Sequence, residues 1–143
     1  MSQIKLSIRL RGELPSSDEL TRTIGVTPTE TRRCGDVVGR RRIQPTDVWI
    51  LELAQFDSDN TSDQILNQIM QATTTLQQIA PALVTLALDQ TSCNAELYTS
   101  IIQEEDQGGF TLPRELLAVT ADAKLSIEFS ILVMLDDYEE PEQ

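Results

Sequence analysis

Five arginines lie within eleven residues of this chain and form its densest group of side chains with binding chemistry. They are Arg32, Arg33, Arg40, Arg41 and Arg42. A guanidinium group presents a planar fork of donors that matches the oxygens of a carboxylate or a phosphate. Gly35 and Gly39 lie between arginines and can expose backbone N–H groups to an anion. The segment therefore predicts a site for an anion or for an acidic partner.

Other interpretations of this arginine cluster stay open. Its arginines can pair with the chain's own carboxylates in a solvated loop, which requires no ligand. Nucleic-acid binding fits less well, because no aromatic residues are interleaved with the arginines to stack on bases. The Walker pattern Gly-x4-Gly-Lys-Ser/Thr is absent. Asp36 and Trp49 complete the candidate binding residues, although Trp49 is favoured as a core side chain beneath the loop over a binding anchor.

The arginine cluster belongs to a chain that is otherwise acidic. Its 143 residues include 11 Lys+Arg and 23 Asp+Glu, and the net charge is −12. Residues 1–46 contain nine of the basic and five of the acidic residues and carry +4, whereas residues 47–143 carry −16. Phosphate backbones repel such a chain overall. Its acidic surface can steer a basic partner toward it.

The chain contains no histidine. This excludes Ser–His and Cys–His nucleophilic catalysis, general acid–base chemistry by histidine and the usual zinc sites. Two cysteines, Cys34 and Cys93, are too few for a disulfide framework. A redox role for Cys34, beside Arg32 and Arg33, stays an alternative to an incidental thiol. We expect a protein that is not an enzyme and has no metal or cofactor, with an enzyme that uses the arginine loop as the alternative.

Alternation of apolar and polar residues predicts four strands, at residues 4–11, 48–54, 92–103 and 125–135. Three helices are expected between them: one from Ser16 to Gly25, one from Ser62 to Pro81 with further turns to residue 88, and one at Pro113. On the first strand Arg9 and Arg11 share the polar face. On the third strand Glu96 and Tyr98 do so.

This order of elements indicates an α+β fold. One-sided alternation predicts a two-layer sandwich in which helices cover one face of a four-stranded, mostly antiparallel sheet. The second and fourth strands are the most apolar, so we place them at the centre. Residues 26–46 are expected to form a long exposed loop, with a short strand around Val37 and Val38. Residues 1–135 form one domain, and residues 136–143 an acidic tail that is expected to be disordered.

Nothing in the sequence indicates membrane insertion or export. No apolar run approaches the roughly 18 residues that cross a bilayer. The N-terminus alternates polar and apolar residues, which is unlike a signal peptide. We therefore expect a cytoplasmic protein with no membrane partner.

Three groups of residues together resemble a known family. The first is Ile24-Gly25-Val26-Thr27-Pro28-Thr29. The second is Gly35-Asp36, the arginine-rich stretch, Pro45 and Trp49. The third is Gly108-Gly109-Phe110-Thr111-Leu112-Pro113-Arg114-Glu115-Leu116-Leu117. Over roughly residues 3–131 the chain is similar to the small bacterial proteins known as domain of unknown function 4279.

The resemblance implies a stand-alone cytoplasmic α+β domain and implies no activity. Two features depart from the family pattern. Typical members have an aspartate followed by an aromatic residue in the last strand, where this chain has Glu128 and Phe129. The acidic tail looks like an addition.

The leading hypothesis is a non-catalytic protein-interaction module, an immunity-type or regulatory binder of a basic protein partner. The alternative is a domain that binds a small phosphate or carboxylate at the arginine loop. A third hypothesis is a homodimer in which strand edges and the arginine loop of one protomer pair with the acidic face of another.

Overall fold

The computed structural model describes residues 2–38, 42–57, 59–89, 93–104 and 109–134. These residues form three helices and seven strands. In chain order the elements are β1 (Gln3–Gly12), α1 (Ser17–Ile24), β2 (Glu30–Arg32), β3 (Val37–Val38), β4 (Arg42–Ile43), β5 (Asp47–Asp57), α2 (Ser62–Asp89), β6 (Cys93–Gln103), α3 (Arg114–Asp122) and β7 (Ser126–Val133).

Five strands form one mixed sheet in the order β2-β5-β1-β6-β7. β1 is antiparallel to β5 and β6, and β2 is antiparallel to β5, whereas β6 and β7 are parallel. The α+β class is confirmed, but the sheet has five strands instead of the four predicted, and its last pair is parallel. The parallel pair follows from α3, because a helix between two strands returns the chain to its starting end.

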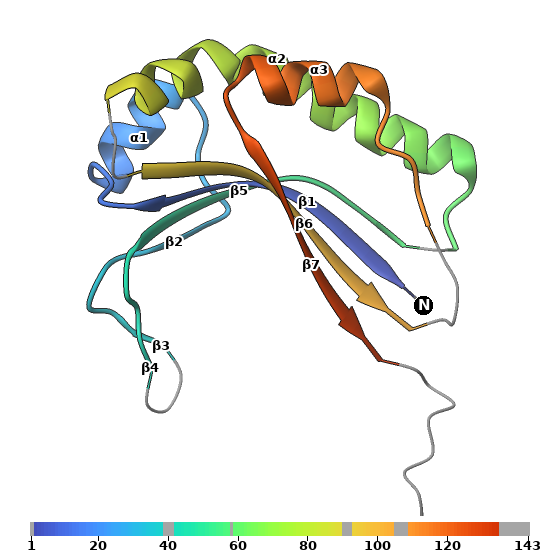
Figure 1. Cartoon of the computed structure of the whole chain (residues 1–143), viewed down its shortest axis with the longest axis horizontal. Coiled ribbons are helices and arrows are strands. Elements are labelled where there is room, and N and C mark those ends of the chain that lie inside the picture. The colour runs from blue at the N-terminus through green and yellow to red at the C-terminus, as the bar shows by residue number, and fades with distance from the viewer. Residues whose placement is uncertain (1, 39–41, 58, 90–92, 105–108, 135–143) are drawn as a thin grey trace, which may run out of the picture.

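The three described helices cover one face of the sheet, while the other face is open and concave (Figure 1). Successive strand residues point to opposite faces, so every second residue of a strand enters the core. The core joins Leu6 and Ile8 of β1 to Trp49 of β5, Leu97 of β6 and Leu76 of α2. The residues between these core positions therefore form the open face.

Local capping residues set the helix ends. Ser16 caps α1, as predicted. At the start of α2 the Gln64 N–H donates to Thr61 Oγ1 (3.2 Å), and the Thr61 N–H donates to Gln64 Oε1 (2.8 Å). This reciprocal pair is a capping box, so Thr61 and not Ser62 caps the helix. The sequence predicts that Pro81 ends or kinks this helix, with further turns to residue 88. The helix does not end there: the turns after Pro81 belong to the same helix, which continues to residue 89.

The fourth predicted strand, β7, lies at an edge of the sheet and not at its centre. The predicted position rested on its apolar content. That reasoning fails because the helix layer leaves much of the strand uncovered: Phe129, Ile131, Leu132 and Val133 are exposed. The central strand is β1, which is apolar on one face only. The second predicted strand, β5, does lie between two neighbours.

The segment predicted as a long loop contains three short strands. β2 pairs with β5 and adds the fifth strand to the sheet. β3 and β4 form a separate hairpin with Val37 opposite Ile43, and Figure 1 shows it projecting below the open face. The short strand expected around Val37 and Val38 is confirmed. β2 and β4 were missed because two or three residues are too few to show a period.

Part of the predicted organisation lies outside the described residues. Residues 135–143 include the whole predicted tail, so its boundary stays a prediction. Within the described part of the chain, no helix has both the length and the apolar character needed to cross a membrane.

Candidate functional site

The open face of the sheet carries a hollow of about 440 Å³ that is lined by arginines. The polar lining residues are Arg9, Arg11, Arg32, Arg42, Gln44, Thr46 and Tyr98. Val48 and Ile50 of β5 belong to its apolar wall. The residues that line it, all of them described, include no carboxylate. We call this feature the arginine-lined hollow.

Strand alternation places the first two arginines in the hollow. Arg9 and Arg11 occupy the open-face positions of β1, while Leu10 between them is buried in the core. The register of β1 with β5 sets Arg9 beside Ile50 and Arg11 beside Val48. Each arginine therefore has an apolar neighbour on β5 for its methylene stem.

Arg9 is held in place by three neighbouring side chains. Its Nε and Nη2 donate to Glu96 Oε2 at 3.1 and 2.7 Å, and Nη2 also donates to Glu128. The guanidinium carbon lies 4.1 Å from the centroid of the Tyr98 ring, a cation–π contact. Burial lowers the pKa of Arg9, but the hydrogen bond and charge of Glu96 and the charge of Glu128 outweigh it, so the pKa is raised.

Glu96 is the shared counter-ion beneath the hollow. Besides Arg9, it accepts a hydrogen bond from Arg11 Nη2 at 2.9 Å. Burial raises the pKa of Glu96, but the hydrogen bond from Arg9 and the charges of Arg9 and Arg11 contribute to a net lowering. Glu96 therefore stays ionised near neutral pH and orients arginines without donating a proton. Within the described ranges, no three His, Cys, Asp or Glu side chains are grouped to hold a metal.

Three arginines of the hollow keep donors for a ligand. The side chains of Arg11 and Arg32 are each 43% exposed, although Arg11 Nε itself is buried and has no hydrogen-bond partner among the described residues. Arg32 pairs with Glu30 at 2.7 Å. Arg42 is exposed and forms no ion pair with any residue that the structure describes. The four guanidinium groups meet three carboxylates, so positive charge remains here on a chain of −12.

The predicted arginine cluster is divided by the structure. Arg32 lies opposite Val48 and lines the hollow. Arg33, the next residue, points elsewhere: its Nη1 donates to the Pro15 carbonyl (3.0 Å), and its Nη2 lies 3.5 Å from Asp47 Oδ2. The two adjacent arginines thus have different roles: Arg32 lines the hollow, and Arg33 anchors the loop.

The other predicted residues shape the surroundings of the hollow. Gly35 has a φ of 92° and Asp36 Oδ2 accepts a hydrogen bond from the N–H three residues earlier (2.8 Å), so both form the turn into the hairpin. Trp49 is fully buried among core residues, in agreement with the sequence-based preference for a core side chain over a binding anchor. Arg40 and Arg41 lie outside the described residues.

Sequence reasoning did not select Arg9, Arg11, Gln44 or Tyr98 as site residues. The polar faces of the first and third strands were visible as alternation. That these faces adjoin the arginine segment depends on β5 lying between β2 and β1, which no local pattern encodes.

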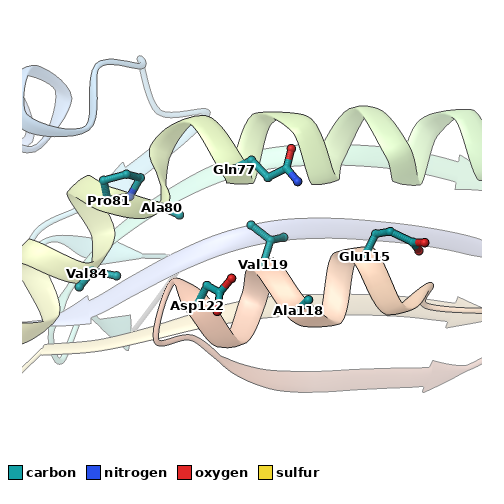
Figure 2. A pocket seen from close by; sticks show the side chains of 8 residues that line it. All are labelled: Gln77, Ala80, Pro81, Val84, Glu115, Ala118, Val119 and Asp122. Carbon is teal, nitrogen blue, oxygen red and sulfur yellow. The ribbon is translucent and has the colours of Figure 1, made fainter.

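Two other hollows have different chemistry. One, of about 480 Å³, lies between α2 and α3, with Glu115 and Asp122 on α3 and apolar residues such as Val84 between the helices (Figure 2). The other, of about 360 Å³, lies near the end of β7 and includes Phe56 and Phe110. Neither has an arginine or lysine among its lining residues, all of which are described.

Fold and site together define a two-layer α+β domain whose open sheet face carries an arginine-lined hollow. The model of the family described as domain of unknown function (DUF4279) matches residues 2–134, and the chain belongs to this family. The resemblance seen in the sequence is thereby confirmed. Comparison with curated proteins and with solved structures found no match.

Proposed function

We propose that this protein binds a small anionic ligand, one that bears a carboxylate or a phosphate, in the arginine-lined hollow. The observation that supports this most is the convergence of four guanidinium groups on a hollow whose described lining contains no carboxylate. Its volume of about 440 Å³ is typical of small-molecule sites. An acidic chain would otherwise repel an anion, so the local positive charge favours binding at this place.

The contacts of the lining residues suggest a separate role in ligand binding for each of them. Arg9 is stacked on Tyr98 and bound to Glu96, so it forms a rigid charged floor. Arg32 and Arg42 at the open side supply planar donors for the anionic group. Val48 and Ile50 offer an apolar surface beside them. We therefore expect an anion that is joined to an apolar or planar part.

Thermal unfolding and calorimetric titration with inorganic phosphate, citrate, benzoate and adenosine monophosphate test this proposal. A bound ligand raises the melting temperature because it stabilises the folded state. Arg42→Ala and Arg32→Ala should each weaken binding by about tenfold or more, the loss expected for a hydrogen bond to a charged group. Arg114→Ala, on exposed α3, is the charge-matched control and should bind like the wild type.

The proposal fails if none of these anions raises the melting temperature. It also fails if Arg114→Ala weakens binding as much as Arg42→Ala does, because the effect would then reflect net charge alone. Added salt should weaken binding in the wild type, since screening reduces the attraction between partly exposed charges.

A second candidate function is the binding of a basic protein partner, as a regulatory or immunity-type binder in the cytoplasm. The groove between α2 and α3 favours it, because Glu115 and Asp122 flank apolar side chains there. Capture from a native-host lysate at low salt should yield a stoichiometric partner with the wild type. Glu115→Lys with Asp122→Lys should lose that partner, while Arg42→Ala keeps it. Equal capture by all three chains would contradict this candidate.

A further inference from the structure

β7 is a long edge strand without the usual protection against pairing. It extends over eight residues in uninterrupted register with β6, and no other described strand lies on its outer side. Natural edge strands are commonly guarded by charges, proline, bulges or short length. β7 contains no proline, and its one charged residue, Glu128, is engaged by Arg9. The edge is therefore open and close to neutral.

Large apolar side chains are concentrated on this edge. The exposed fractions of Phe129, Ile131, Leu132, Val133 and Met134 lie between 52% and 62%. Single exposed apolar residues are ordinary on protein surfaces, but a contiguous group marks an interaction site. The helix layer stops short of these residues, so the group remains uncovered within the described chain.

Hydrogen bonding to β6 shows which backbone groups of β7 are free. The Met134 N–H donates to the Gln103 carbonyl (2.6 Å), directed toward β6. Backbone polar groups alternate in direction along a strand, so even-numbered residues of β7 face β6. The odd-numbered residues from Ile127 to Val133 direct their N–H and C=O groups to the outer edge.

We infer that a second copy of this chain pairs its β7 with this edge, antiparallel about a two-fold axis through Ser130. The pairing sets Phe129 opposite Ile131 and Ile127 opposite Val133, all odd-numbered residues with outward backbone groups. Ser130 lies opposite itself as a pair without direct hydrogen bonds. The two five-stranded sheets become one continuous sheet. This inference is independent of the proposed anion site.

A second copy fits the edge better than a charged partner. In a two-fold dimer the same strand lies on both sides of the interface, so each apolar contact between different residues occurs twice. Glu128 stands opposite Leu132 and not opposite another acid, so two chains of net charge −12 meet without a like-charge contact on the paired strands. Ile131 also lines the hollow that contains Phe56 and Phe110, so Phe129 of the second copy would lie beside that hollow.

Sedimentation velocity of the full chain over a wide concentration range tests the dimer. The wild type should form dimers, and Ile131→Lys should raise the dissociation constant by about tenfold or more, since symmetry disrupts each contact twice. Leu117→Lys on α3, also at an exposed apolar residue, is the matched control and should dimerise like the wild type. A monomeric wild type, or equal dimerisation of the two variants, would overturn the inference.

Disulfide trapping tests the register independently of stability. In a Cys34→Ser, Cys93→Ser background, Ser130→Cys places two thiols on residues whose Cα atoms are about 4.5 Å apart, within the range for a disulfide. Ser126→Cys is the control on the same strand: the two copies of Ser126 lie eight positions apart, roughly 26 Å. Oxidation should link Ser130→Cys chains and leave Ser126→Cys chains unlinked. Linking of both or of neither would overturn the proposed pairing.

Discussion

Arg9 and Glu96 lie directly opposite each other on β1 and β6, and two guanidinium nitrogens of Arg9 donate to the same carboxylate oxygen at 3.1 and 2.7 Å. Their side chains are only 18% and 10% exposed. Such a pair must stay complete, because removal of one partner leaves a charge in a poorly solvated place. The pair also lies beneath the arginine-lined hollow and orients the groups that we propose bind an anion.

Arg9→Ala should lower the free energy of unfolding by about 2 kcal/mol, because Glu96 and Glu128 both lose their hydrogen bonds to Arg9, and Arg11 is the one arginine that still binds Glu96. Urea unfolding measures this difference. The double variant Arg9→Leu, Glu96→Leu should recover part of the loss, since the two charges that then lack a partner, Arg11 and Glu128, are each 43% exposed to solvent. Arg22→Ala on exposed α1 is the control and should differ from the wild type by less than about 0.5 kcal/mol. Equal effects of Arg9→Ala and Arg22→Ala would refute this role.

Acid should remove the stabilising effect of Glu96. Its pKa in the folded protein lies below the ordinary value of 4.5, because burial, which raises the pKa, is outweighed by hydrogen bonds with Arg9 and Glu128 and by the charges of Arg9 and Arg11. A lowered pKa stabilises the folded state above about pH 4.5, and the effect disappears as the pH falls through the folded-state pKa. The difference in unfolding free energy between wild type and Glu96→Gln should therefore shrink from pH 6 to pH 3. A constant difference would contradict this assignment.

Asp47 should hold the loop that carries Cys34. Its Oδ1 accepts from the Cys34 N–H (2.8 Å) and its Oδ2 from the Leu14 N–H (3.1 Å). The Cys34 hydrogen bond is the largest cause of the lowered pKa of Asp47. In a Cys93→Ser background, Asp47→Ala should increase the rate of hydrogen exchange at the Cys34 amide and cost about 1–2 kcal/mol of stability. Asp63→Ala, at an exposed residue of α2, should leave both unchanged.

Gly25 should be required because of its positive φ, and not because a side chain at this position would clash with its surroundings. It ends α1 with a φ of 87°, and its N–H donates to the Thr21 carbonyl at 2.7 Å. A Cβ atom there would meet no heavy atom within 4 Å. Gly25→Ala should therefore cost about 1 kcal/mol through the left-handed conformation alone. A Cβ atom at Gly109 would also meet no heavy atom within 4 Å, and the φ of Gly109 is not positive. Gly109→Ala should therefore leave the melting temperature close to that of the wild type.

The sequence alone determined the three helices, the four long strands and the buried face of β1. Alternation along β1 separates Ile8 from Arg9, and capping residues such as Ser16 mark helix ends, because side-chain direction and capping are local properties of the chain. The same local signals identified the arginine segment, with Arg32 and Arg42 among the residues that line the hollow.

Only the tertiary structure decided which of these residues meet. Arg9 and Glu96 are 87 positions apart in sequence and become neighbours because β1 pairs with β6. The pairing of β2 with β5 brings Arg32 to the hollow, while Arg33 turns to Asp47. β7 lies at the edge although it is strongly apolar. Strand order follows from the joint burial of all the surfaces beneath the helices, and no short window of sequence contains that information.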